Sequence, residues 1–215
     1  KSIAGLIFLI VISTPVLADI NGSSPLLFGV ISDRNSASAA AAARVFHETY
    51  PDIDIQLRTP EQLASLPDTV ITAQLERAAA VLVAGVFSDD ATRLARLING
   101  IVPNKPIIIV SSSRDLVLRS KTGDGWVATT DSIEAAMADP SGSVWGRAHA
   151  YWQARGPENL AALFGYLISK PSERDELPEP IPLKSIRYGD RLGPRDAPLI
   201  ALLDYETGEQ AGNLG

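Results

Sequence analysis

Four short apolar runs, separated by stretches with helical character, constrain the fold of this chain more than any other feature. The runs cover residues 26–32, 53–57, 79–87 and 106–110. Three of them are continuously apolar, which is typical of strands buried on both faces of a sheet, whereas residues 53–57 alternate apolar and polar side chains. Strands that alternate with helices predict a parallel sheet with right-handed crossovers and helices on both faces.

The segments between these runs have the expected helix signals. Ser36 starts an alanine-rich helix that Pro51 ends, and Thr59-Pro-Glu-Gln62 is a capping box with Pro at the first helical position. A further helix is expected over about residues 70–77. Ser88 is predicted to cap a helix whose Leu94, Leu97 and Ile98 face the sheet. The predicted fold class is α/β, a doubly wound, mostly parallel sheet of the flavodoxin or Rossmann type, followed by the start of a second domain.

Composition excludes several classes of function. The 215 residues are 46% hydrophobic, enough for a sizeable core, and the net charge of −6 without a basic cluster argues against a nucleic-acid partner. The chain contains no Cys and two His, so neither a disulfide framework nor a self-contained thiolate or histidine metal centre is expected.

The first eighteen residues have the pattern of a targeting segment. Lys1 precedes an apolar run over residues 3–12, and Val16-Leu17-Ala18 is typical of a cleavage site before Asp19. The run is short for a membrane span, although an uncleaved anchor is the alternative. We therefore expect an exported protein, periplasmic or membrane-anchored, with membrane association through residues 1–18.

A change of composition predicts a domain boundary after residue 170. Residues 171–197 are rich in Pro and alternating charges, as expected of a linker. We expect an α/β domain over residues 19–170 and a further domain that begins at residue 198. On this interpretation the sequence is a fragment of a longer protein.

Ligands of such sheets bind beyond the carboxyl ends of the strands, at a topological switch point. Ser111, Ser112 and Arg114 follow the fourth run and could hold a phosphate or carboxylate; the alternative is a serine-rich turn that caps the next helix. Asp89 and Asp90 are interpreted as dipole partners in a first helical turn, with a cation site as the alternative. Neither the dinucleotide nor the P-loop signature is present.

Residues 144–170 read as two helices that meet at Gly156-Pro157. Leu160, Leu163, Phe164 and Leu167 form the apolar stripe of the second helix, and Pro157 suits its first position. Glu158 and Asn159 are therefore polar groups at the N-terminus of this helix. Trp126 and Trp145 are expected to pack under the preceding loop, with stacking on a ligand ring as the alternative.

Two motifs resemble the large subunits of the chelatases. YWQARGPENLAALFGYLISK, residues 151–170, is similar to a segment near the N-terminus of CobN, the large subunit of cobaltochelatase, and of the H subunit of magnesium chelatase. APLIALLDYETGEQAGN, residues 197–213, is similar to the strand that opens the next domain of that family. The two motifs occur in the order and at the separation seen in the family.

The resemblance implies a protein that binds a tetrapyrrole and inserts, or removes, Co²⁺ or Mg²⁺, a ligase forming nitrogen–metal bonds, with ATP used by AAA+ partner subunits. This part of the chain is not expected to be catalytic or to hold a cofactor by itself, and Arg155, Glu158 and Asn159 are the ligand-binding candidates that the resemblance adds. Family relatives are cytoplasmic, so an export signal departs from the pattern. The alternative is an exported, non-catalytic α/β binding module for a small anionic ligand.

Overall fold

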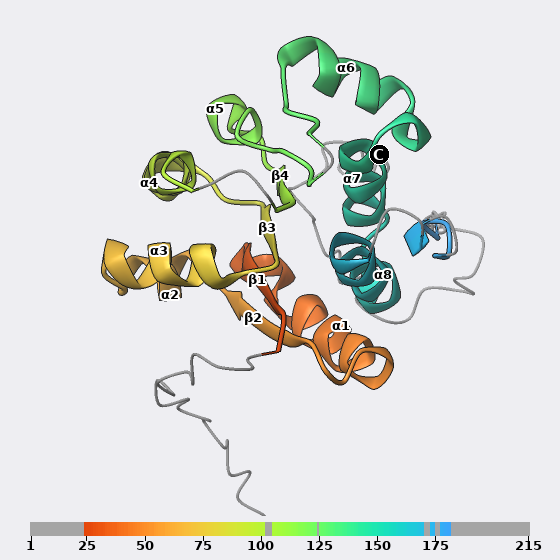
Figure 1. The fold of residues 1–215 in the computed structure, drawn as a ribbon, viewed down its shortest axis with the longest axis horizontal. Coiled ribbons are helices and arrows are strands. Elements are labelled where there is room, and N and C mark those ends of the chain that lie inside the picture. The colour runs from red at the N-terminus through yellow and green to blue at the C-terminus, as the bar shows by residue number, and fades with distance from the viewer. Residues whose placement is uncertain (1–23, 102–104, 124, 170–172, 175–176, 182–215) are drawn as a thin grey trace, which may run out of the picture.

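The computed structural model describes residues 24–101, 105–123, 125–169, 173–174 and 177–181, which form an α/β structure around one parallel sheet (Figure 1). Four strands, β1 (Leu26–Ile31), β2 (Asp54–Arg58), β3 (Ala80–Ala84) and β4 (Ile107–Val110), lie in the order β2-β1-β3-β4. All three strand pairs are parallel, with Val30 opposite Arg58 and Val83, and Val83 opposite Ile109. The predicted fold class is confirmed.

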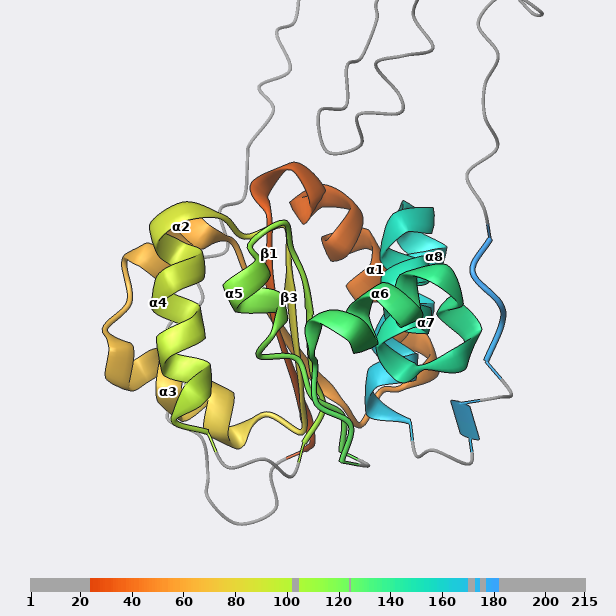
Figure 2. The same ribbon diagram turned by 90° about the horizontal axis from the view of Figure 1, so that it is seen from above.

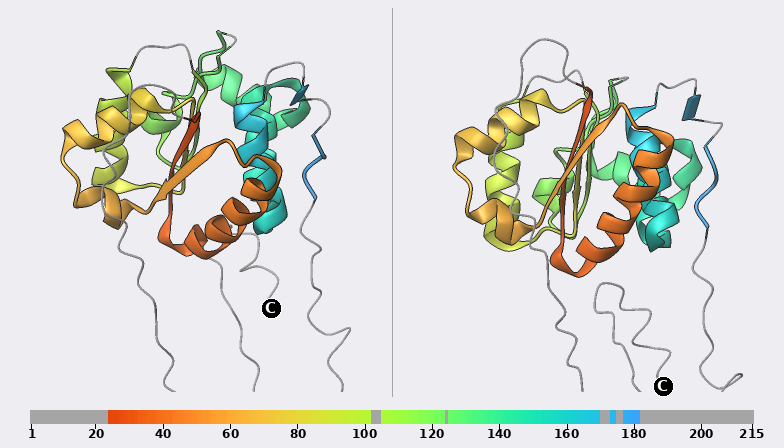
Figure 3. Two further views of the ribbon diagram at one scale, coloured as in Figure 1. Left: turned by 60° about the horizontal axis from the view of Figure 1, so that its bottom comes forward. Right: turned by 90° about the horizontal axis from the view of Figure 1, so that it is seen from below.

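Helices cover both faces of the sheet (Figure 2). On one side lie α1 (Ser36–Thr49), α6 (Thr130–Ala138), α7 (Val144–Ala154) and α8 (Gly156–Ile168). On the other lie α2 (Pro60–Ala64), α3 (Asp68–Arg77) and α4 (Ser88–Asn99), with the short α5 (Arg114–Val117) beyond the end of β4. Two single-turn 3-10 helices, η1 (Asp33–Asn35) and η2 (Pro140–Gly142), precede α1 and α7. Figure 3 shows the sheet enclosed between these two layers.

The core follows the apolar pattern of the sequence. Every residue of β1, β3 and β4 is buried, whereas β2, at one edge, is only partly covered. The predicted stripe of α8 is confirmed, since Leu160, Leu163, Phe164 and Leu167 are all buried. Phe164 meets Phe46 of α1 edge to face, with ring centroids 6.1 Å apart, so α1 and α8 share one apolar interface.

Two of the local helix signals have different outcomes. The capping box at Thr59 is confirmed: its hydroxyl accepts from Gln62 N at 3.3 Å, and Gln62 Oε1 accepts from Thr59 N at 3.1 Å. The prediction that Ser88 caps α4 is wrong, because Phe87 is the N-cap residue and no side chain caps this helix. Ser88 instead begins the helix with a positive φ of 56°. This conformation lies where the β3–α4 connection meets the helix, and no residue pattern signalled it.

The outer edge of β4 is covered by the chain that follows it. Lys121 pairs with Ile107 in an isolated antiparallel bridge. Ile109 N donates to Ser120 Oγ at 3.0 Å, and Ile109 O accepts from Trp145 Nε1 at 3.0 Å. The edge groups of Ile109 are therefore satisfied, as an edge strand requires. The expectation that Trp145 packs in the interior is confirmed, because it is 1% exposed.

Part of the predicted linker packs against the domain. The described residues 173–174 and 177–181, which we call the C-terminal strap, lie along α7 and α8. Arg147 Nη2 forms an ion pair with Glu179 at 2.8 Å, and the Tyr151 hydroxyl donates to Pro178 O. Arg174 is buried with its guanidinium over the Tyr166 ring. The Pro-rich composition of the strap did not predict this packing. Side chains of α7 and α8 donate to backbone carbonyl groups of the strap, and a composition pattern does not indicate such contacts.

The predicted targeting segment over residues 1–18, most of the predicted linker and the predicted domain start at residue 198 lie outside the described residues. Export and the division into domains therefore stay predictions. Among the described residues we find no helix with the length and hydrophobicity of a membrane span.

Candidate functional site

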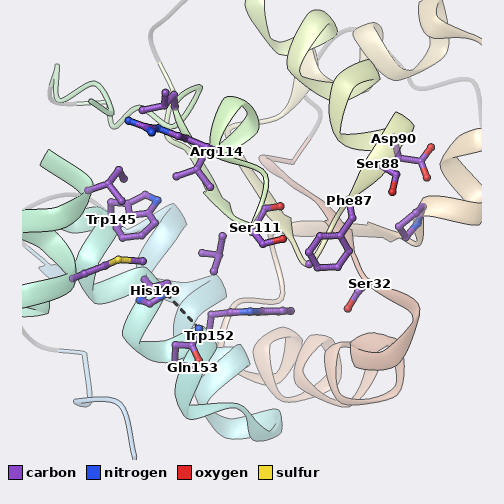
Figure 4. Close-up of a pocket in the computed structure, with 18 of the residues that line it drawn as sticks. Ser32, Phe87, Ser88, Asp90, Ser111, Arg114, Trp145, His149, Trp152 and Gln153 are labelled. Carbon is purple, nitrogen blue, oxygen red and sulfur yellow. Dashed lines mark hydrogen bonds between the residues drawn. The ribbon is translucent and has the colours of Figure 1, made fainter. Parts of the chain in front are cut away.

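An open cleft of about 1190 Å³ lies beyond the carboxyl ends of β1, β3 and β4. The chain moves to one side of β1 to form β2 and then to the other side to form β3, so the β1–β3 boundary is the topological switch point. Ligands of open parallel sheets bind at this place because the two connections diverge there and leave a crevice. We call this cavity the switch-point cleft (Figure 4).

The strand ends supply the polar floor of the switch-point cleft. Ser32, Gly85 and Ser111 all line it. Ser111 Oγ donates to Val86 O at 2.6 Å and accepts from Ser113 N at 3.1 Å, so this hydroxyl holds the turn after β4 together. This geometry agrees with the serine run forming a turn, whereas the part of the alternative in which it caps the next helix is wrong, because no side chain caps α5. Ser112 is exposed and also lines the cleft.

Three arginines line the switch-point cleft: Arg34, Arg114 and Arg155. Arg114 Nη2 donates to Thr130 Oγ1 at 2.6 Å, which directs the guanidinium across the opening between α5 and α6. A guanidinium has five N–H donors in a planar fork that matches a carboxylate.

Acidic residues also line the cleft, namely Asp33, Asp90 and Glu134. Asp33 and Asp90 lie in the first turns of η1 and α4. For Asp90, at the start of a twelve-residue helix, this is the position that the helix dipole favours for an anion. The predicted interpretation of the Asp89-Asp90 pair thus agrees with its place in the fold.

Apolar and aromatic side chains face this polar rim. Phe87 is 45% exposed and Met137 is 55% exposed, and both line the cleft. Trp152 of α7 reaches toward Ser111 and Phe87 from the opposite wall (Figure 4). The cleft therefore combines an apolar surface with charged groups that can bind an anion, as small-molecule sites commonly do.

His149 lies on the same wall as Trp152 and lines the cleft. Its ring stacks on Trp145, with centroids 5.0 Å apart and planes inclined by 11°. Gln153 Nε2 lies 3.3 Å from His149 Nε2. Burial lowers the pKa of His149 below the usual histidine value, so the imidazole is neutral at physiological pH.

Two residues of the cleft have strained backbones. Ser88 has φ 56° and Arg155 has φ 52°, and within the described residues these are the only non-glycine residues in the positive-φ region. Such conformations cost about 1–3 kcal/mol each and occur preferentially at functional sites. Arg155 separates α7 from α8, so the predicted helix break is confirmed one residue before Gly156.

The structure does not bring all the sequence-predicted residues together. Ser111, Ser112, Arg114 and Arg155 line the switch-point cleft, whereas Glu158 and Asn159 do not. Glu158 is exposed in the first turn of α8. Asn159 is 7% exposed and turns toward the C-terminal strap, where Nδ2 donates to Ile181 O at 2.9 Å and Oδ1 accepts from Ile181 N at 2.8 Å. Its amide joins helix and strap.

Most of the cleft wall was not predicted from the sequence, although stacking on a ligand was the alternative interpretation of Trp145. Trp145, His149 and Trp152 are spaced i, i+4 and i+7, which places them on one face of α7. Thr130, Ile133, Glu134 and Met137 are spaced i, i+3, i+4 and i+7 on α6. Both patterns were available in the sequence, but helical spacing alone does not distinguish a cleft wall from a core.

Among the described residues, no group of three or more His, Cys, Asp or Glu could hold a metal ion. Comparison of the chain with models of protein families finds no match, and comparison with curated proteins also finds none.

Proposed function

We propose that this chain is the tetrapyrrole-binding N-terminal part of a chelatase-type large subunit, and that the ring binds in the switch-point cleft. The observation that carries the proposal is the combination of an exposed apolar surface at Phe87 and Met137 with the arginine side chains that line the same cavity. A tetrapyrrole has the complementary chemistry, because it is a flat apolar macrocycle that carries carboxylate side chains.

The stretch that carries the family resemblance supports this proposal. Trp152, Gln153 and Arg155 belong to the YWQARGPENL motif, and all three line the cleft. The motif therefore forms one wall of the cavity as well as a helix start. Insertion or removal of Co²⁺ or Mg²⁺, with ATP used by AAA+ partners, is assigned to the whole protein, and this chain contributes the binding of the ring.

A second candidate is a binding module for a small anionic ligand. Arg114, Ser112 and Thr130 favour it, because they bring a guanidinium and hydroxyl groups to one side of the cleft. A small anion would use this polar side alone and would not need the apolar wall. The two candidates therefore differ in what they require of Phe87.

The test is absorbance titration of the chain with metal-free protoporphyrin IX. Phe87→Ala and Arg114→Gln should each weaken binding about tenfold, the equivalent of about 1.4 kcal/mol per lost contact. Val127→Ala and Arg119→Gln are matched controls, because both side chains are exposed and neither lines the cleft. Absence of ring binding by the wild-type chain would reject the proposal. Stabilisation by citrate or phosphate that depends on Arg114 but not on Phe87 would favour the second candidate.

A further inference from the structure

His149 is set apart from the other groups of the switch-point cleft by its chemistry. It is a neutral imidazole on the wall of a cavity, and its ring orientation is fixed by stacking on the buried Trp145. Imidazole nitrogen is a common ligand of transition metals. The other histidine of the chain, His47, is exposed on α1 and does not line the cleft.

The contact with Gln153 involves the ring nitrogen Nε2 of His149. Gln153 Nε2 lies 3.3 Å from His149 Nε2, and this contact is a hydrogen bond in the tautomer that carries the ring proton on Nδ1, because an amide nitrogen can only donate. In that tautomer Nε2 carries the lone pair. Gln153 is exposed, so its side chain can leave this lone pair without exposing a buried group.

We propose that His149 Nε2 is an axial ligand to the central metal of a metallated tetrapyrrole bound in the switch-point cleft. The inference rests on the proposed function and deepens it, because it assigns a preference for the metallated ring over the metal-free ring. The step is a simple ligand exchange: the Nε2 lone pair forms a dative bond to the metal, a water leaves the metal, and no proton or electron is transferred. Gln153 gives up one hydrogen bond.

The lining of the cleft is consistent with an axial position for His149. Its neighbour Trp152 lies on the same wall, and Phe87 lies across the cleft from both (Figure 4). A flat ring between Phe87 and the α7 wall presents its face, and therefore its central metal, to that wall. Arg114 lines the same cleft, and a guanidinium is suited to bind a carboxylate at the edge of the ring.

The decisive probe is cobalt(II) protoporphyrin IX, studied by electron paramagnetic resonance with the wild-type chain. One axial nitrogen splits the cobalt signal into triplets through the ¹⁴N nuclear spin, and protein labelled with ¹⁵N-histidine should give doublets. His47→Ala should leave this pattern unchanged. A bound cobalt ring without nitrogen splitting would overturn the inference, and so would a splitting that is lost in His47→Ala. This test requires no substitution of His149.

Titration of variants supplies a second, independent measurement. His149→Ala and His149→Gln should weaken binding of the cobalt ring by about tenfold or more, the range for loss of a metal-site group, and should leave the affinity for metal-free protoporphyrin IX within about twofold. Added imidazole should restore the nitrogen splitting in His149→Ala. Equal weakening for both rings would mean that His149 only shapes the wall. If the wild-type chain binds neither ring, the proposed function itself fails. If it binds both rings and substitution of His149 changes neither affinity, only the present inference fails.

Discussion

At the scale of single residues, strained conformations gather around the switch-point cleft. Ser88, Arg155 and Gly85 all have positive φ, and all three line the cavity. Glycine adopts a positive φ without steric cost, so Gly85 is unstrained. At Ser88 and Arg155 the Cβ atom makes the same conformation unfavourable. The fold therefore maintains unfavourable backbone geometry at the place where we propose that the ligand binds.

Asp68 gives a residue-scale prediction about pH. Its carboxylate accepts from Arg93 Nε at 2.7 Å and from Arg96 Nη2 at 2.6 Å, which ties the start of α3 to α4. The hydrogen bond from Arg93, followed by that from Arg96, lowers the pKa of Asp68 below its ordinary value of 3.8. A lowered folded-state pKa contributes stability that is present above the unfolded-state pKa and is lost as the pH falls through the folded-state pKa.

Asp68→Asn should therefore be less stable than the wild type at neutral pH. The difference in unfolding free energy should shrink as the pH falls below about 3.8 and vanish below the folded-state pKa. Urea unfolding between neutral pH and the acid limit measures this difference. Asp52→Asn, at an exposed acid, controls for the removal of one negative charge. A difference that does not change with pH would show that the charge of Asp68 contributes nothing.

At the scale of elements, most helices and strands could be predicted because their signals are local. The apolar runs predicted β1, β3 and β4 as buried strands, and the stripe from Leu160 to Leu167 predicted α8. Contacts between elements could not be predicted in this way. The fit of α7 against η2 depends on Gly146, which stands in an ordinary helical stretch of the sequence.

Gly146 permits a close approach that an added methyl group would prevent. A Cβ there would lie 2.7 Å from Pro140 O and 2.8 Å from Ala136 O, and backbone atoms cannot move aside cheaply. Gly146→Ala should lower the unfolding free energy by about 1–3 kcal/mol, the usual cost of overpacking.

Gly100→Ala is the matched control for this change. The nearest atom to a Cβ at Gly100 is 3.5 Å away, which is an ordinary contact, and its φ is −77°. This variant should be as stable as the wild type or more stable by about 0.4–1 kcal/mol, because the unfolded chain loses freedom. Denaturant unfolding of the two variants checks both values, and equal stability would contradict the steric argument.

At the scale of the whole molecule, the switch-point cleft exists only once distant segments are brought together. The sequence indicated the chain after β4 and the α7–α8 break as separate candidates, and the topology places Arg114 and Arg155 in one cavity. Because the sheet is parallel, the carboxyl ends of its strands could be predicted as a ligand-binding site. The aromatic wall of α7 was not predictable, because its position depends on how the helix packs across β4.

The C-terminal strap is a second long-range feature of the molecule, and Asn159 connects it to the helices. The Asn159 side chain makes two hydrogen bonds to the backbone of Ile181, one through Nδ2 and one through Oδ1. Its Nδ2 also donates to Arg155 O at 2.7 Å and to Ala154 O at 3.2 Å. One buried amide thus joins the end of α7, the start of α8 and the strap. The stability of all three segments should therefore depend on the Asn159 amide.

Asn159→Ala should lower the unfolding free energy by about 1–3 kcal/mol, because it leaves buried polar groups without partners. It should also release the strap and so speed trypsin cleavage after Arg174, which is 8% exposed and held by Tyr166 O at 3.2 Å. Cleavage mapped by mass spectrometry over time measures this effect. Glu158→Gln, at the exposed neighbouring position, is the matched control and should change stability by less than about 0.5 kcal/mol. Equal cleavage rates after Arg174 in both variants would show that Asn159 does not hold the strap. Cleavage in wild type as fast as in Asn159→Ala would show that the strap does not protect Arg174.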